Sequence, residues 1–133
     1  MTRFLFITIL TIIIVSCNKS PLNSSSGSIT GKWLYKQYYY SIGGPPIYVS
    51  TDSARQWILF NADGSFSANV PGFANFKRFE MIDSLRIKFI TPLQPGFRLF
   101  NLDLDATRNI LTLSPADYIC IEGCGNIFKR DGF

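Results

Sequence analysis

The side chains that most often carry out acid–base chemistry, metal binding or nucleophilic attack are scarce in this sequence. Its 133 residues include no histidine, three cysteines and nine acidic residues. Without histidine the chain lacks the usual general base near neutral pH and the commonest metal ligand. A serine or cysteine nucleophile would have no imidazole to activate it. The composition therefore argues against an enzyme, a bound cofactor and a metal site.

The aspartates offer one other route to catalysis, because two converging carboxylates are enough for some hydrolases. Asp103 and Asp105 alternate along one expected strand, but they lie beside a turn, where solvated aspartates are common. The other aspartates in turn-like contexts are Asp52, Asp63, Asp83 and Asp117. We therefore expect these carboxylates to have structural roles.

Charge and hydrophobicity indicate a single folded domain without a nucleic-acid partner. The net charge is +4, and the thirteen basic residues are spread along the chain instead of forming one patch. Hydrophobic residues make up 47% and aromatic residues 15% of the sequence, far more than a disordered chain contains. The length suits one domain.

The first residues read as an export signal. Arg3 precedes an apolar run over 4–15. As a helix this run would be about 18 Å long, which is short of the ~30 Å hydrocarbon core of a membrane. The segment therefore predicts a signal peptide and not a permanent transmembrane helix.

The run ends in Ile14-Val15-Ser16-Cys17, which resembles the lipobox of bacterial lipoproteins, with Ile where Leu is usual. The resemblance implies that 1–16 are removed, that Cys17 carries acyl chains in a membrane, and that the polar segment 17–28 is a flexible tether. In lipoproteins of this type an aspartate directly after the acylated cysteine is typical of retention in the inner membrane. Because this sequence has Asn18 there, the resemblance implies the outer membrane of the cell envelope, on its periplasmic or its outer face. The alternative is an ordinary secretory signal with an incidental cysteine.

From residue 31 onward the sequence alternates with a period of two, which is typical of half-buried strands. The clearest examples are 65–70 and 84–89. The expected strands are 32–40, 56–61, 65–70, 76–82, 85–91, 97–104, 110–114 and 125–130. Short turns between them predict an all-β fold over 29–133, an antiparallel eight-stranded up-and-down barrel. A sandwich of two sheets is the alternative.

Several short motifs resemble the lipocalins and the small lipocalin-like domains of bacterial lipoproteins. The motifs are Gly31-Lys32-Trp33, Phe60-x-x-Asp63-Gly64-x-Phe66, Cys120-x-x-x-Cys124 and Phe128-Lys129-Arg130. The resemblance implies a barrel in which Arg130 packs over Trp33 and closes one end. It also implies that the long segment 41–55 forms a lid over the open mouth. At about a hundred residues the barrel is small, so its cavity is expected to be small or filled.

Cys120 and Cys124 form an even pair in an oxidising compartment once Cys17 is assigned to lipid. On an extended strand they would lie about 13 Å apart, too far to bond. Gly123 and Gly125 allow the chain to turn, so a disulfide is feasible. A redox-active pair or metal ligands are the alternatives.

Aromatic residues suggest binding. In the first strand Trp33, Tyr35, Gln37 and Tyr39 share one face by parity, which we expect to be the interior. The predicted cavity residues are Tyr35, Gln37, Tyr39, Phe66, Phe79 and Phe89.

One hypothesis is a lipid-anchored envelope protein that binds a small apolar or amphipathic ligand inside the barrel. The other is a filled barrel that binds or inhibits a partner protein through exposed aromatic residues such as Tyr38, Tyr40 and Tyr48.

Overall fold

A computed structural model describes residues 29–51, 55–92, 96–117, 120 and 123–132. These residues form nine β-strands, and each pairing between them is antiparallel. The strands are β1 (Gly31–Tyr40), β2 (Ile47–Ser50), β3 (Trp57–Phe60), β4 (Phe66–Ala68), β5 (Arg78–Met81), β6 (Arg86–Ile90), β7 (Phe97–Leu104), β8 (Ile110–Pro115) and β9 (Cys124–Arg130). The predicted all-β class is confirmed.

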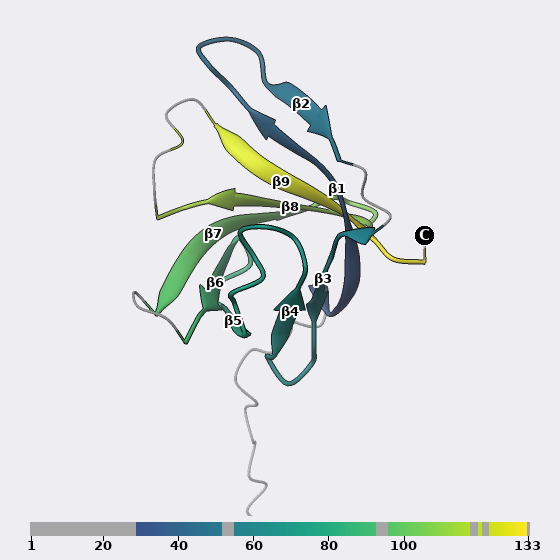
Figure 1. Ribbon diagram of the computed structural model, residues 1–133, viewed down its shortest axis with the longest axis vertical. Coiled ribbons are helices and arrows are strands. Elements are labelled where there is room, and N and C mark those ends of the chain that lie inside the picture. The colour runs from purple at the N-terminus through teal and green to yellow at the C-terminus, as the bar shows by residue number, and fades with distance from the viewer. Residues whose placement is uncertain (1–28, 52–54, 93–95, 118–119, 121–122, 133) are drawn as a thin grey trace, which may run out of the picture.

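Eight of the strands form an up-and-down barrel (Figure 1). Their order around the sheet is β4-β3-β1-β9-β8-β7-β6-β5, so the last strand returns beside the first. A bridge between Ser65 and Arg78 closes the seam between β4 and β5. Beside it, the backbone N–H of Phe66 donates to the carbonyl of Lys77 at 2.8 Å. The nearly closed barrel, and not the sandwich, is the observed architecture.

Alternation of apolar and polar residues explains why these segments form a barrel wall. In β6, Ile87 and Phe89 are buried, whereas Arg86 is exposed and Lys88 is half-buried. Each such strand covers the core with one face and leaves the other face to solvent. The turn between β3 and β4 needs a left-handed residue, and Gly64 supplies it with a φ of 81°.

β1 pairs with two different strands along one edge. Its first half, up to Leu34, pairs with β3, and its second half, from Gln37 onward, pairs with β2. The resulting β1–β2 hairpin projects past the barrel at the top of Figure 1. The prediction of a lid over 41–55 is therefore wrong where the structure describes this segment, because Ile47-Tyr48-Val49 pairs with β1 and continues the sheet. Residues 52–54 lie outside the described part of the chain.

A β-bulge divides β1 into two halves of opposite phase. Across the β1–β9 ladder Tyr35 lies opposite Phe128, whereas Gln37 lies opposite Ile127, so Lys36 is an extra residue. Successive side chains of a strand point to opposite faces. One extra residue therefore reverses which face every later side chain occupies.

The core is an aromatic cluster inside the barrel. Eight of the nine phenylalanines among the described residues are buried: Phe60, Phe66, Phe73, Phe76, Phe79, Phe89, Phe100 and Phe128. Phe73 and Phe76 belong to no strand, because the connection 69–77 between β4 and β5 folds inward and carries them, together with Val70, into the barrel. Turn-type hydrogen bonds hold the connection: the Phe73 N–H donates to the Val70 carbonyl at 3.1 Å, and the Phe76 N–H donates to the Phe73 carbonyl at 3.1 Å.

Candidate functional site

Trp33 and Arg130 close the end of the barrel at which β1 begins. The indole of Trp33 is fully buried, and Cζ of Arg130 lies 4.2 Å from its ring centroid. Arg130 donates hydrogen bonds to the carbonyls of Thr30 at 3.0 Å and Arg108 at 3.1 Å, while Nε1 of Trp33 donates to the carbonyl of Ile29 at 2.8 Å. The predicted contact is present, and its hydrogen bonds tie the two ends of the barrel sequence together.

The interior contains side chains at the place where a ligand was expected. The predicted cavity residues from the strands are buried there: Phe66, Phe79 and Phe89. The rings of Phe66 and Phe89 have centroids 4.8 Å apart. Phe73 lies between three strands of the barrel, β6, β7 and β9. Its ring centroid is 5.7 Å from that of Phe89, 5.4 Å from that of Phe100 and 5.8 Å from that of Phe128. These contacts make the phenylalanines a packed core.

Tyr35 faces the interior, as predicted, and uses its hydroxyl within the protein. It is 7% exposed, and its ring centroid lies 5.1 Å from that of Phe128. The hydroxyl donates a hydrogen bond to Oδ1 of Asn126 at 2.9 Å. Burial, with a smaller contribution from Tyr38, raises the pKa of the Tyr35 hydroxyl above its ordinary value. Tyr35 is therefore a neutral donor that positions Asn126.

Gln37 and Tyr39, also predicted to line the cavity, lie on the outer face of the wall. The ring of Tyr39 covers Gly125 of β9, where a Cβ atom would lie 2.5 Å from Cε1 of the tyrosine. Its hydroxyl is hydrogen-bonded to Oγ of Ser114 at 3.0 Å. The prediction that these two residues face the interior is wrong, because counting by twos from Trp33 does not allow for the bulge.

Exposed aromatic and aliphatic residues gather on the inner face of the β1–β2 hairpin. Past the bulge, the rings of Tyr38 and Tyr40 stack with centroids 6.2 Å apart. Val49 and Ile47 lie directly opposite them on β2. Tyr38, Tyr40 and Ile47 are 37–40% exposed, and Val49 is half-buried. We call these four residues the hairpin patch.

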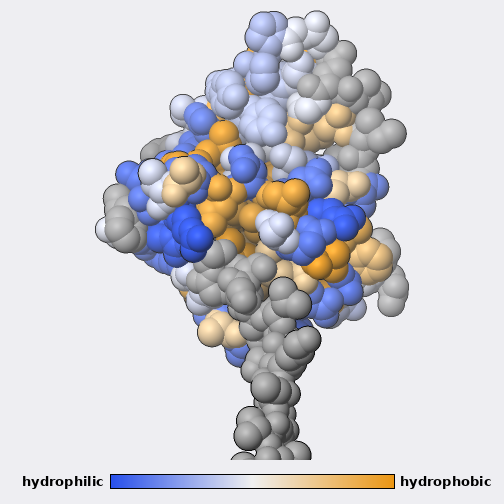
Figure 2. All heavy atoms as spheres, turned by 180° about the vertical axis from the view of Figure 1, so that it is seen from behind, coloured by the Kyte–Doolittle hydropathy of each residue, from blue (hydrophilic) through white to orange (hydrophobic). Residues whose placement is uncertain are grey.

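The rest of the hairpin is also exposed. Tyr48 is 58% exposed on the opposite face, where its ring centroid lies 5.7 Å from that of Tyr39. Ile42, at the tip, is 76% exposed. The predicted exposure of Tyr38, Tyr40 and Tyr48 is confirmed. In Figure 2 the top of the molecule is pale, of intermediate hydropathy, whereas the body below carries strongly hydrophilic and strongly hydrophobic areas.

The predicted disulfide between Cys120 and Cys124 is confirmed, with Cα atoms 5.8 Å apart. It lies beside the hairpin, because Cys124 is opposite Tyr40 in the β1–β9 ladder. Within the same loop the carbonyl of Gly123 accepts a hydrogen bond from the backbone N–H of Ser41 at 3.0 Å. The disulfide therefore closes the loop against which the tip-side end of β1, at Tyr40 and Ser41, is fixed.

The carboxylates of the turns hold backbone groups. Asp105 accepts hydrogen bonds from the Thr107 hydroxyl and from the backbone N–H of Ile110, and these contacts lower its pKa to about 2. Asp63 and Asp83 likewise accept hydrogen bonds from residues of their own turns. The described residues contain no group of three or more acidic, cysteine or histidine side chains placed to hold a metal ion.

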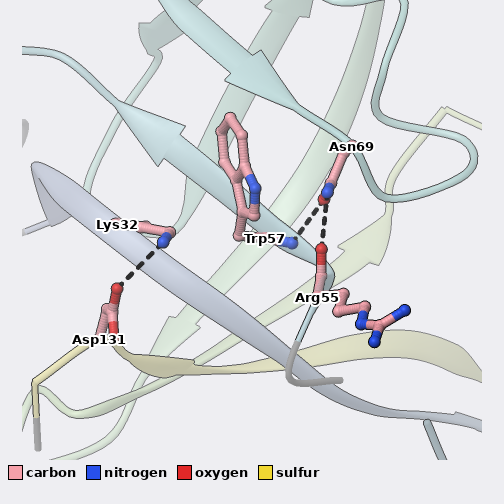
Figure 3. Close-up of polar contacts among 5 residues, drawn as sticks. All are labelled: Lys32, Arg55, Trp57, Asn69 and Asp131. Atoms are coloured by element: carbon pink, nitrogen blue, oxygen red, sulfur yellow. Dashed lines mark hydrogen bonds and ion pairs between the residues drawn. The ribbon is translucent and has the colours of Figure 1, made fainter. Parts of the chain in front are cut away.

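A set of contacts on the outer wall fixes the point where the chain enters β3 (Figure 3). The backbone N–H of Trp57 donates to Oδ1 of Asn69 at 2.7 Å, and Nδ2 of Asn69 donates to the carbonyl of Arg55 at 2.6 Å. Nζ of Lys32 lies 5.8 Å from the centroid of the Trp57 ring and 3.3 Å from Oδ2 of Asp131. The backbone of Arg55 is thus held while its exposed side chain extends away from Trp57.

The predicted lipid anchor, Cys17, and the whole of 1–28 lie outside the described residues. The signal peptide, the tether and the membrane location stay predictions. Within the part of the chain that the structure describes, no helix has the length and apolar character needed to cross a membrane.

Two features of the site were missed by reading the sequence pattern. Ile47 and Val49 follow Pro46 in a β-branched and aromatic run, which is a strand signal that the surrounding glycines and prolines obscured. Phe73 is flanked by residues typical of turns, so nothing in its neighbourhood marked it as a core residue.

No protein-family model matches this sequence, and a search of curated proteins gives no match.

Proposed function

We propose that this protein is a lipid-anchored binding module of the bacterial cell envelope that engages a partner protein through the β1–β2 hairpin. Its barrel serves as a rigid support for that hairpin. Of the two hypotheses, we thus favour a filled barrel that binds a partner protein, and not a barrel that binds a small ligand in its interior.

The observation that carries the proposal is the position of Phe73. Its ring is in contact with phenylalanines of β6, β7 and β9, so it occupies the central space that a small eight-stranded barrel has for one ligand. An interior ligand would have to displace a buried aromatic side chain, and removing a buried Phe costs about 3–5 kcal/mol. This cost favours recognition at the surface.

The hairpin patch has the chemistry of a protein-binding surface. Tyrosine is enriched where one side of a residue packs against a partner and its hydroxyl meets water. The stacked rings of Tyr38 and Tyr40, with Ile47 beside them, form one contiguous exposed group. The ladder with β9 and the loop closed by the disulfide hold this group in place, which lowers the entropic cost of binding.

The direction of the chain supports presentation of the hairpin away from a membrane. β1 begins at the end closed by Trp33 and ends in the hairpin at the opposite end of the barrel. A tether from Cys17 enters the barrel at Ile29, which is buried beside Trp33. An anchor at Cys17 would thus leave the patch facing away from the lipid.

Photo-crosslinking in intact cells tests the proposal. A benzophenone amino acid at Val49, in the patch, should give a discrete protein adduct, and the same probe at Thr112 on β8 should not. The double variant Tyr38→Ser/Tyr40→Ser should lower the adduct yield by about tenfold or more, as expected when two central aromatic contacts are lost. Phe97→Ser, at an exposed aromatic residue of β7 outside the hairpin, is the matched control.

Two further measurements complete the test. Cys17→Ala should release the folded protein into the soluble fraction, and retention in the membrane fraction would contradict the anchor. Native mass spectrometry of protein extracted from cells should give the mass of the polypeptide with its lipid alone. A co-purifying small molecule, together with adducts that do not depend on the patch, would contradict the proposed function.

A further inference from the structure

The hairpin has a free edge as well as an exposed face. Among the described residues, β2 pairs with β1 and with no other strand. Each of the eight barrel strands has a neighbour on both sides, once the bridge between Ser65 and Arg78 is included. β2 is thus the one described strand with an open edge.

The ladder register identifies the backbone groups on that edge. The N–H of Thr51 donates to the carbonyl of Lys36 at 2.9 Å, which makes theirs a hydrogen-bonded pair. Bonded and non-bonded pairs alternate in an antiparallel ladder, so Val49 directs its backbone groups toward β1. The N–H and C=O groups of Tyr48 and Ser50 point the other way, where another strand would lie.

This edge has none of the charges that normally protect exposed strands. Natural edge strands carry charged residues, a proline or a bulge that block pairing with another chain. Residues 37–51 contain no charged side chain, and β2 itself contains no proline. The exposed residues of the hairpin patch lie next to this uncharged edge.

Positive charge lies at the base of the hairpin. Lys36 and Arg55 are exposed, and neither forms an ion pair with a carboxylate of the described residues. Figure 3 shows the Arg55 side chain extending away from its neighbours. Asp52, the one acidic residue between them in the sequence, lies outside the described residues, and two basic residues against one acid leave the base net positive.

We propose that β2 is a strand-addition site for an extended segment of another protein. The segment pairs antiparallel with β2, is uncharged along that strand, and carries acidic residues at the end next to Lys36 and Arg55. Its alternate side chains extend the apolar face of the hairpin patch. This inference rests on the proposed function, because it specifies how the partner binds to the same hairpin.

A second copy of this chain is a poorer occupant of the edge. Two β2 strands related by a two-fold axis would run antiparallel, so the closed ends of the two barrels would point in opposite directions. Tethers entering at Ile29 of each copy would then leave opposite sides of the dimer. Anchors in one membrane favour a partner other than this chain.

The test replaces one backbone donor on the free edge. Ser50→Pro removes the N–H that points away from β1 and leaves the β1–β2 hydrogen bonds intact, whereas Ser50→Thr keeps the N–H. In full-length protein in intact cells, with the benzophenone probe at Tyr48, Ser50→Pro should lower the adduct yield by about tenfold. Ser50→Thr should leave the yield unchanged, and circular dichroism should give both variants the parent melting temperature.

The crosslinked segment, identified by mass spectrometry, then serves as a synthetic peptide probe. N-methylation of the alternate amides that face β2 should abolish its binding to the detergent-solubilised full-length protein, while N-methylation of the other amides should not. Lys36→Glu/Arg55→Glu should weaken binding by about five- to tenfold at low salt, because attraction to the acidic end of the segment becomes repulsion. The matched control is Lys129→Glu, on a distant part of the wall.

The outcomes separate this inference from the proposed function. If Ser50→Pro retains the adduct while Tyr38→Ser/Tyr40→Ser loses it, the partner binds the face of the hairpin and strand addition is wrong. If the adduct joins two copies of this chain, or if no adduct forms at Tyr48 while one forms at Val49, the inference is also overturned. Loss of adduct at both positions contradicts the proposed function itself.

Discussion

The interior of the barrel and the β1–β2 hairpin are both rich in aromatic residues, but they use different ones in different ways. The interior contains eight phenylalanines, most of which contact one another edge to face or tilted, with Phe76 and Phe89 stacked, at centroid distances from 4.8 Å upward. The described aromatic residues of the hairpin are tyrosines, and two of them stack at the surface. Phenylalanine has no polar group that needs a hydrogen-bond partner, so it suits a closed core. Tyrosine suits a surface that is exposed to water in the free protein and buried in a complex, because its hydroxyl can hydrogen-bond to water. The interior is thus suited to stability, and the hairpin is suited to the recognition that we propose for it.

The strongest test of this contrast is to remove a ring from the core. Phe73→Ala should lower the free energy of unfolding by about 3–5 kcal/mol, because it deletes a buried ring and leaves a cavity between β6, β7 and β9. Urea denaturation followed by tryptophan fluorescence measures the change. Phe97→Ala is the matched control, since Phe97 is 49% exposed, and it should cost less than about 1 kcal/mol. Equal losses in the two variants would remove the distinction between core and surface rings.

A smaller loss is expected at the closed end. Arg130→Gln should cost about 2–3 kcal/mol, because it removes the cation–π contact with Trp33 and the charge-assisted hydrogen bonds to two carbonyls. Lys129→Gln, one residue earlier on the outer face, should be nearly neutral. Equilibrium unfolding in guanidinium chloride distinguishes them. A neutral Arg130→Gln would mean that the burial of Trp33 alone closes the barrel.

Removing the disulfide should have an effect of about 2 kcal/mol, as the entropy of a five-residue loop predicts. In Cys120→Ser/Cys124→Ser the loss should be concentrated at the hairpin, because Ser41 and Tyr40 lie against the loop that the disulfide closes. Hydrogen exchange should become faster in residues 38–42 and stay unchanged in β6 and β7. Faster exchange throughout the barrel would show that the disulfide stabilises the core as well.

The turn that begins at Asp105 should make stability depend on acid pH. Hydrogen bonds from Thr107 and Ile110 lower its pKa to about 2 in the folded state, from 3.8. A carboxyl whose pKa is lowered by folding stabilises the fold above the unfolded value and loses that contribution as the pH falls through the folded value. The parent protein should therefore lose stability between about pH 4 and pH 2, and Asp105→Asn should lose less. Asp103→Asn, in β7 just before the turn, is the matched control in thermal melts, because it removes a carboxylate and leaves the hydrogen bonds of the turn in place.

The smallest change in stability is expected in the hairpin patch. Tyr38→Ser/Tyr40→Ser should alter the free energy of unfolding by less than about 1 kcal/mol, because both rings are more than a third exposed. The same variant should lose most of its partner adduct. A loss of stability comparable to that of Phe73→Ala would mean that the hairpin tyrosines belong to the core, and the contrast between the two regions would fail.

The sequence predicted the barrel well, because alternation and turn residues act locally. All eight expected strands overlap observed ones, and β7 was predicted with its observed ends, Phe97 and Leu104. The pairing of Trp33 with Arg130 was also reachable, since both lie on terminal strands that must meet when a meander closes. These features depend on patterns of a few residues, which a sequence displays directly.

The candidate site was less predictable, because it depends on a register that no local pattern marks. A single extra residue at Lys36 moved Gln37 and Tyr39 from the predicted interior to the outer face. Phe73 was missed for a similar reason, since its burial comes from the whole connection 69–77 folding back into the barrel. Non-local packing decides both outcomes.

The extra residue at Lys36 also separates two kinds of constraint within one strand. Before the bulge, Trp33 and Tyr35 point into the packed interior of the barrel. After the bulge, the alternation is reversed, and no later residue of β1 is fully buried. A complete substitution scan should therefore find intolerance at alternate positions up to Tyr35 and no such rhythm beyond. The sequence of the β1–β2 hairpin could then change rapidly among descendants of this gene, or be replaced by a different loop, while the sequence of the barrel core stays the same.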